Sequence, residues 1–529
     1  MVRLSDSDGF QIRDTRGGIQ MNDSSDHRSL INRLNRIGIA LSSEHSLGRL
    51  LETIVSELRS FTRSDGGSIY IIAGDKLSFE VAQNDTLERR FGSVPFKSSL
   101  IPLDTRSIAG YVASTGSLIN IPDLDAVGDD TPYSLATMRE FDRKMDLKTV
   151  SMLAVPMRNH KDEIIGVVQL MNSLDDNGRP VPYDPWMVEI VASLASQAAV
   201  AICNSILISD IKQLFESLVT YSAQAIDARS PHTAGHSLRV SILVMRQVEA
   251  INRTTDGPFR DISFSDEQMN ELRMAAWLHD IGKIGVREYV LDKVNKLSDD
   301  RIALIATRFD FIKSEAVRRG AERKLALLGA EGAFSPEKAG EIDRETALEI
   351  QRIAEDIGLI LKLNKPGPVS SEESSRLAEI ALRTYRDGTG SERPCLNADE
   401  LEHLMVSRGN LTDSERSEIQ SHVDHTLNIL EKIPFTKELR NIPRFAATHH
   451  EMLDGSGYPN KLRADDIPFQ SRIIAVADIY EALTAKDRPY KPPLPHETAV
   501  AILRDEARKG KLDSDLVELF IKENVQTSI

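Results

Sequence analysis

The chain has 529 residues, which at about 150 residues per domain predicts roughly two to four domains. Its 41% hydrophobic and 27% charged residues are typical of a globular protein. The net charge of −15 argues against a nucleic-acid polymer or an anionic membrane as the main partner. The negative net charge is compatible with a small phosphorylated ligand that a few basic side chains hold locally.

The two cysteines and the lack of a targeting pattern narrow the class of protein and its expected location. Cys203 and Cys395 are far apart and lack metal-type spacing, which excludes a disulfide framework and a zinc ribbon. We see no signal-peptide pattern and no uninterrupted run of about 18 apolar residues, so we expect a cytoplasmic protein. Residues 1–27 are polar and predict a disordered tail.

Residues 28–204 mix helical and strand-like patterns. Apolar residues recur at helical spacing over 27–62 and 185–205. Strand-like stretches occupy 66–74, 76–83, 150–159 and 163–173, and Gly74-Asp75 marks a hairpin turn. We predict an α+β domain with a central antiparallel sheet and flanking helices.

Two stretches of this domain, SIAGYVASTGSLINIPDL (107–124) and SMLAVPMRNHKDEIIGVVQLMNS (151–173), resemble a GAF domain. The resemblance covers nearly all of 28–204 and implies a sensory module that binds a small molecule, often a cyclic nucleotide, or a dimerisation platform. Phe79, Tyr111 and Asn172 are candidates for lining a pocket, with core or turn roles as the alternative. A purely structural GAF domain fits equally well.

A seam of apolar residues follows the domain. Its members are spaced 4, 3, 4 and 3 apart, as in a coiled coil: Leu207, Ile211, Leu214, Leu218 and Tyr221. Because the seam lies between two domains, we favour a parallel homodimer linker over 205–222. A single helix packed on its own domain is the alternative.

The remainder, 223–529, has an almost entirely helical pattern, and seven of the twelve histidines fall at a few points in it. The candidate ligands are His232, His236, His279, Asp280, His422, His425, His449, His450 and Asp478. Each alone could be a surface or satisfied core residue, but an unpaired Asp280 at the end of an apolar helix would cost several kcal/mol. His and Asp ligands without thiolate suit iron, manganese, zinc or nickel, and several of them on separate helices predict a two-metal site for phosphate ester cleavage.

The order H…HD…H…HH…D, with HDIGKIG (279–285), HHEMLDGSGYP (449–459) and KDRPYK (486–491), resembles the HD-GYP subgroup of HD-domain phosphohydrolases. The resemblance covers about 220–300 and 405–500. It implies an all-α, metal-dependent phosphodiesterase that hydrolyses cyclic di-GMP to pGpG or GMP. A GAF domain ahead of it is a familiar order and implies regulation by that domain.

The resemblance also implies roles for individual residues. One metal would be held by His236, His279, Asp280 and Asp478, and the second by His422, His449 and His450 with Asp280 bridging; iron or manganese is expected for both. Asp280 and Lys283 would be catalytic, with Lys283 also meeting charge on the phosphoryl oxygens. Arg488 and Lys491 would contact phosphate, and Gly457, Tyr458 and Pro459 would shape the substrate edge. Asp454 is expected to organise that turn.

The chain departs from the family pattern at two positions. Arg308 stands where the middle histidine is usual, and arginine cannot ligate a metal. The surrounding LSDDRIALIATRF (297–309) recurs as LTDSERSEIQSHV (411–423), which aligns His422 with Arg308. We therefore predict a mostly helical insertion over about 300–405 and take His422 as the ligand. The insertion could serve as a lid, a dimer contact or a spacer.

The second departure is His232, where family members commonly have Tyr or Glu. With Ser230 as N-cap and Pro231 as the first helical residue, His232 and His236 would share a helical face. His232 is thus a candidate ligand for a third metal ion, with local hydrogen bonding as the alternative.

Two further functions stay open from the sequence. The same chemistry could act on another cyclic dinucleotide, such as cyclic GMP-AMP, because metal ligands do not select the base. The chain could also be a nucleotide-binding signalling scaffold with little turnover.

Overall fold

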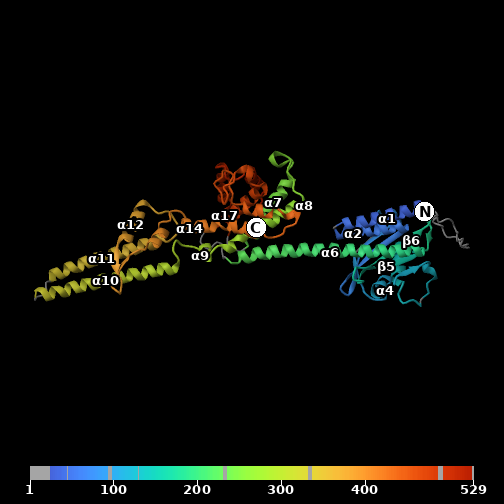
Figure 1. Cartoon of the computed structure of the whole chain (residues 1–529), viewed down its shortest axis with the longest axis horizontal. Helices are drawn as coiled ribbons and strands as arrows, with labels where there is room; N and C mark the ends of the chain where they lie inside the picture. Colours follow the sequence, from blue (N-terminus) through green and yellow to red (C-terminus); the bar gives the residue numbers. More distant parts are fainter. Residues whose placement is uncertain are drawn as a thin grey trace, which may run out of the picture. The chain divides into compact units, whose positions relative to one another are not determined.

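A computed structural model describes residues 24–44, 46–92, 98–128, 130–229, 235–331, 336–485 and 493–526. The chain divides into two compact units, Met1–Leu214 and Phe215–Ile529 (Figure 1). Each unit is described by itself below.

The first unit contains a seven-stranded antiparallel sheet of order β3-β2-β1-β6-β5-β4, with β7 paired to β6. Its strands are β1 (Ser64–Ala73), β2 (Lys76–Asn84), β3 (Ser99–Pro102), β4 (Ile119–Ile121), β5 (Met152–Arg158), β6 (Ile164–Leu174) and β7 (Pro180–Val181). Its helices are α1 (Ser24–Ser43), α2 (Leu47–Thr62), α3 (Asp85–Phe91), α4 (Ile108–Thr115), η1 (Leu124–Ala126), α5 (Ala136–Met145) and the first part of α6 (Pro185–Asp227). The predicted α+β class and the Gly74-Asp75 turn are confirmed.

Alternation along the strands gives the sheet two packed faces. On β5, Leu153 and Val155 enter a core shared with α1, α2 and α6. Met152 and Ala154 point the other way, into a core shared with α4. Of the pocket candidates, Phe79 stacks on Tyr70 and Tyr111 meets Tyr133 edge to face. Asn172 accepts a hydrogen bond from Val150 N (2.7 Å). These contacts fit the core and turn roles.

Helix α6 is 43 residues long and crosses from the first unit into the second. By length and composition alone it could span a membrane, and 39% of its most apolar stretch is buried inside the protein. The sequence of α6 shows no uninterrupted apolar run because Glu189, Ser193 and Gln197 stand among its apolar residues.

The second unit is a bundle of helices around one large core. It comprises α7 (His236–Arg253), η2 (Gly257–Phe259), α8 (Asp266–Leu278), η3 (Ile281–Gly285), α9 (Glu288–Leu291), α14 (Asp413–Gln420), α15 (His422–Leu430), η4 (Lys437–Leu439), α16 (Ile442–Ala447), η5 (Ala464–Asp466), α17 (Phe469–Thr484), α18 (His496–Arg508) and α19 (Ser514–Lys522). The prediction that one helix carries His236 together with the residues before it is wrong: α7 begins at His236, because its N-cap Gly235 has φ +70°, which no right-handed helix can pass through. Ser230 and Pro231 lie outside the described residues.

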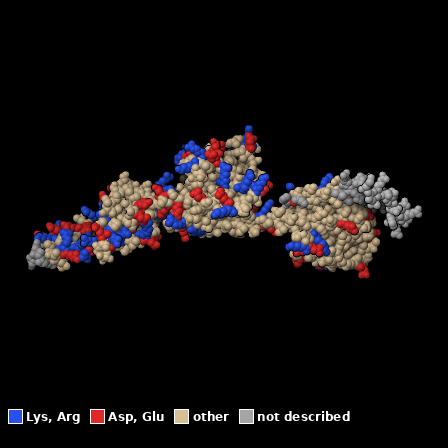
Figure 2. All heavy atoms as spheres, in the orientation of Figure 1, with Lys and Arg blue, Asp and Glu red and all other residues tan. Residues whose placement is uncertain are grey.

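The inserted segment forms α10 (Asp299–Glu331), α11 (Pro336–Leu363), α12 (Ser371–Leu382), β8 (Thr384–Arg386), β9 (Glu392–Pro394) and α13 (Ala398–Leu404) around a separate core. Apart from the short β8–β9 hairpin, it is helical as predicted. At the base of the insertion, where its two ends meet, Asn410 Nδ2 donates to the carbonyls of Lys293 (2.5 Å) and Val294 (3.2 Å). Acidic and basic side chains alternate along α10 and α11 (Figure 2). Solvent-exposed ion pairs therefore connect these two helices.

Candidate metal centre

The candidate ligands of the second unit are brought together at the ends of helices. His279 is the C-cap of α8, His236 begins α7, His422 begins α15, and His449 and His450 follow α16. Asp478 projects from within α17. Gly282 lets α15 approach this closely, because a Cβ at residue 282 would lie 1.9 Å from the His422 carbonyl oxygen.

Three of the histidines are oriented in the same way. Each donates from Nδ1 to the carbonyl three residues earlier: His279 to Ala276 (2.7 Å), His422 to Ile419 (2.6 Å) and His449 to Ala446 (2.5 Å). A carbonyl only accepts, so Nδ1 carries a proton and Nε2 is the nitrogen left to bind a metal. Metal-ligating histidines are typically held in this way.

His236 is oriented by a carboxylate instead. Its Nδ1 lies 2.5 Å from Glu481 Oε2, and Arg239 Nε donates to the other oxygen of Glu481 (2.7 Å). The sequence analysis missed Glu481, although its place one helical turn after Asp478 on α17 was a usable signal.

The nitrogen atoms facing inward converge on Asp280. Asp280 Oδ2 lies 3.3 Å from Nε2 of both His236 and His279, whereas Oδ1 lies 3.2 Å from His422 Nε2. Asp478 Oδ1 lies 3.3 Å from His236 Nε2, and Asp478 Oδ2 lies 3.9 Å from His450 Nδ1. One oxygen of Asp280 therefore faces each set of histidines.

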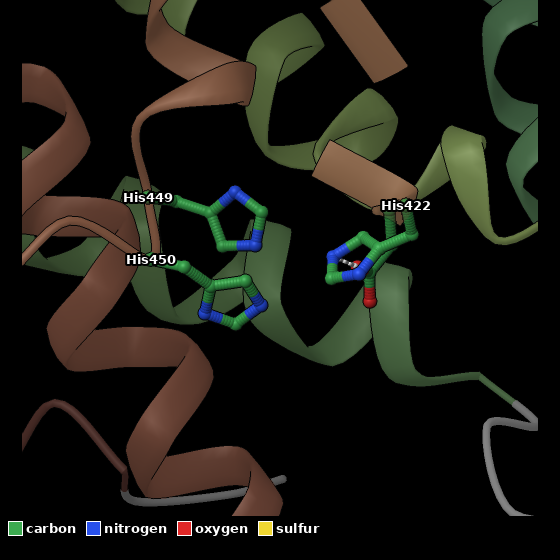
Figure 3. Close-up of side chains that lie close together, drawn as sticks. His422, His449 and His450 are labelled. Atoms are coloured by element: carbon green, nitrogen blue, oxygen red, sulfur yellow. Dashed lines mark ion pairs between the residues drawn. The ribbon is translucent and has the colours of Figure 1, made fainter. Parts of the chain in front are cut away.

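Two groups of donor atoms result, each spanning at most 4.8 Å: His236, His279 and Asp280 in one, and Asp280, His422, His449 and His450 in the other. Figure 3 shows His449 and His450 side by side, with His422 facing them. Asp280 belongs to both groups, as a bridging ligand would.

Buried atoms without hydrogen-bond partners test whether a metal fits. Three buried atoms of the site have no hydrogen-bond partner in the described structure: Asp280 Oδ1, His422 Nε2 and His449 Nε2. His422 Nε2 and Asp280 Oδ1 face each other across 3.2 Å, and a metal ion beside them would satisfy both atoms. The donor set therefore fits divalent metal ions; it does not select among iron, manganese, zinc and nickel.

The protonation preferences of Asp280, His449 and His450 agree with this fit. Burial opposes the charge on Asp280, but Lys283 and His279 outweigh it and hold its pKa well below the ordinary value. Burial lowers the pKa of His450 to about 4 and that of His449 well below its usual range. Asp280 is thus charged and His449 and His450 are neutral near pH 7, the forms that bind metal. Burial opposes the charge on His236 and His279, but the neighbouring carboxylates outweigh it and raise the pKa of both histidines.

Lys283 and the Gly-Tyr-Pro turn lie at the margin of the site. Lys283 Nζ donates to Asp280 Oδ2 (2.5 Å), and its side chain is 19% exposed. The Tyr458 ring lies 4.8 Å from that of His450, and the Tyr458–Pro459 bond is cis. Gly457 is required, since a Cβ there would lie 2.3 Å from Met452 N. Asp454 accepts from Ser456 N (2.8 Å), which fits its expected role in the turn.

Other candidates lie elsewhere. Arg308 forms a two-pronged ion pair with Glu400 (2.7 and 2.9 Å) inside the insertion, so the choice of His422 over Arg308 agrees with the geometry. His425 lies against Gly285 rather than in either donor group. His232, Arg488 and Lys491 lie outside the described residues.

Comparison with known proteins matches three regions to family models. Residues 46–202 match a GAF domain, and residues 233–348 and 398–516 match HD domains. The 3'3'-cGAMP-specific phosphodiesterase 3 of Vibrio cholerae is 24% identical over 65% of this chain and 51% of its own length. The cyclic di-GMP phosphodiesterase of Thermotoga maritima is 37% identical over 23% of this chain and 32% of its own length.

The chain carries a GAF domain and an HD domain homologous to the HD-GYP phosphodiesterases. This confirms both resemblances drawn from the sequence. The chain spans about half the length of the first relative and about a third of the second. The GAF domain of an Acinetobacter phosphoenolpyruvate-protein phosphotransferase is 17% identical over 34% of this chain and 96% of its own, with a TM-score of 0.26.

Proposed function

We propose that this GAF–HD-GYP chain is a metal-dependent phosphodiesterase that hydrolyses cyclic di-GMP to pGpG, GMP or both. The observation that carries the proposal is the pair of donor groups that share Asp280. Bound there, two divalent ions would activate a water and neutralise charge on the phosphoryl oxygens. The proposed ligands are His236, His279, Asp280 and Asp478 for one ion, and His422, His449 and His450, with Asp280, for the other.

The surrounding side chains would orient this chemistry. Lys283 fixes Asp280 through Oδ2 and adds a positive charge at the partly exposed edge of the site, where a phosphate would enter. The carbonyls of Ala276, Ile419 and Ala446 and the carboxylate of Glu481 keep the imidazole rings in place. Tyr458, beside His450, offers a ring face at the substrate edge.

A second candidate substrate is 3'3'-cGAMP, because a relative that matches 65% of this chain is named for it. Purified protein loaded with manganese should be incubated in turn with cyclic di-GMP and 3'3'-cGAMP, and the products separated by chromatography. We expect faster turnover of cyclic di-GMP. Faster turnover of 3'3'-cGAMP would change the substrate, and no turnover of either would favour the scaffold function.

The Asp280→Ala variant tests the bridging assignment. It removes one ligand from each donor group, so both bound metal and turnover should fall to background. The exposed Asp210→Ala variant on α6 is the matched control. Retention of two metal ions per chain by Asp280→Ala would contradict the assignment.

We also propose that the chain is a homodimer joined along α6. The five seam residues are 54–68% exposed in the single chain: Leu207, Ile211, Leu214, Leu218 and Tyr221. Burying such a stripe is the usual driving force for helix pairing. The dimer would let a GAF domain, with or without a small ligand, regulate the phosphodiesterase; cytoplasmic location stays a prediction.

A further inference from the structure

The C-terminal end of α6 is built into the second unit. Val219 and Ala223, four residues apart, are buried in its core, and Glu216 pairs with Arg273 of α8 (2.8 Å). The helix ends at Asp227, which is 3% exposed. The end of α6 is therefore fixed relative to the helices that carry the candidate metal ligands.

Asp227 holds the start of α7. The N-cap of α7 is Gly235, which offers no side-chain acceptor. Asp227 supplies one from another helix: its Oδ2 accepts from Ser237 N (2.9 Å) and its Oδ1 from Ser237 Oγ (3.1 Å). A carboxylate is favoured at a helix N-terminus, where free N–H groups and the helix dipole attract it. Ser237 directly follows His236, so Asp227 sets the backbone from which that ligand projects.

Arg229, two residues on, holds the segment that carries Lys283. Its Nη1 donates to the carbonyls of Lys283 (3.1 Å) and Ile284 (2.9 Å), and its Nη2 donates to that of Val286 (2.9 Å). A planar guanidinium can satisfy several carbonyls in one fixed geometry. The turn formed by η3, between His279-Asp280 and α9, is thus held to the end of α6 by a single side chain.

We infer that Asp227 and Arg229 are positioning residues through which the end of α6 sets the reactive geometry of His236 and Lys283. The inference rests on the proposed function and adds a route for its regulation. Helix α6 begins in the core of the GAF unit, and Asp227 and Arg229 lie two residues apart at its other end, so a displacement of that end against α7 and η3 would move both residues at once. His236 would move relative to Glu481, and Lys283 relative to the phosphate it is expected to meet.

The test uses the full chain with Asp227→Asn, Arg229→Gln and Arg229→Lys. Asp210→Asn and Lys212→Gln, at exposed positions of the same helix, are the controls. For Asp227→Asn and Arg229→Gln we expect kcat for cyclic di-GMP to fall about tenfold with KM within about twofold, because a small misplacement of a reacting group lowers the rate of the chemical step. Arg229→Lys keeps the positive charge but loses the planar guanidinium, so its kcat should lie between those of Arg229→Gln and the wild type.

Two readouts do not depend on activity. Manganese retention against a chelator should weaken about tenfold in Asp227→Asn. Amide hydrogen exchange of the peptide covering 281–286 should accelerate in Arg229→Gln, without metal as well as with it. Both controls should match the wild type.

The outcomes separate the two proposals. Variants with wild-type kcat, metal retention and exchange, or variants whose only defect is lower thermal stability, would overturn the positioning roles. A wild-type chain that cleaves no cyclic dinucleotide would defeat the proposed function, and the metal and exchange readouts would still decide the inference. If Asp227→Asn does not fold, the two Arg229 variants decide it.

Discussion

At the scale of single residues, the histidines of the site are distinguished by how their outer nitrogen is held. Three bond a carbonyl three residues back at a helix end, and His236 bonds Glu481. In each case Nδ1 makes this outer contact and Nε2 faces the centre. His425, which lies outside both donor groups, has no such bond to a carbonyl or carboxylate in the described structure.

Glu481→Gln should therefore weaken metal binding without unfolding the protein. The amide keeps the shape and one acceptor oxygen but loses the charge that strengthens His236 as a ligand. We expect manganese affinity to fall about 10- to 100-fold, measured by calorimetric titration. Glu497→Gln, exposed on α18, is the control and should titrate like the wild type. Unchanged affinity in Glu481→Gln would show that His236 does not need this partner.

At the scale of elements, the insertion begins and ends at two similar sequences that fold differently. The first continues as the long helix α10, where Arg308 pairs with Glu400. The second forms α14 and α15, separated at Ser421, and brings His422 into the site. Near the base, Lys293 and Glu415 form a buried pair (2.6 Å).

This pair predicts a pH-dependent contribution to stability. Burial opposes the charge on Glu415, but hydrogen bonds from Lys293 and from Thr412 N outweigh it and lower the pKa of Glu415. Burial lowers the pKa of Lys293. The loss of the pair in acid therefore follows the protonation of Glu415. The contribution is complete above about pH 4.5 and is lost as the pH falls through the lowered value. Glu415→Gln should cost about 3 kcal/mol at pH 7 and progressively less on acidification, measured by urea unfolding.

The exposed pair of Arg323 and Glu345 in the insertion provides the control. Glu345→Gln should cost under about 1 kcal/mol at any pH. An equal cost for both variants, or a cost of Glu415→Gln that does not change with pH, would contradict the account of the buried pair.

Helix α6 gives a second prediction at this scale. Placing charges in the seam with Ile211→Lys and Leu218→Lys should convert a dimer into a monomer near the chain mass of 58.8 kDa, measured by light scattering. Ser209→Lys with Gln213→Lys, on the same helix but off the seam, should leave the mass at twice that value. A wild-type chain that is monomeric at micromolar concentration would rule out the seam as a dimer interface.

At the scale of the whole molecule, local patterns were enough for the classes of both domains and for candidate ligands that the structure brings close together. Asp280 was singled out because an unpaired carboxylate at the end of an apolar helix needs a partner, and the resemblance to the HD-GYP pattern added His236 and Asp478. Glu481 and Arg229 escaped notice, since their importance depends on contacts between segments more than 50 residues apart in the chain. The start of α7 was placed too early because Gly235 was not recognised as a left-handed N-cap.

The most direct test of a paired metal centre is the rate of cyclic di-GMP hydrolysis measured against manganese bound per chain. Metal-free protein should be titrated with manganese, with bound metal and initial rate determined on the same samples. Because Asp280 joins both donor groups, we predict little activity at one ion per chain and a steep rise as occupancy approaches two. Full activity at one ion per chain, or hydrolysis by metal-free protein, would contradict the account.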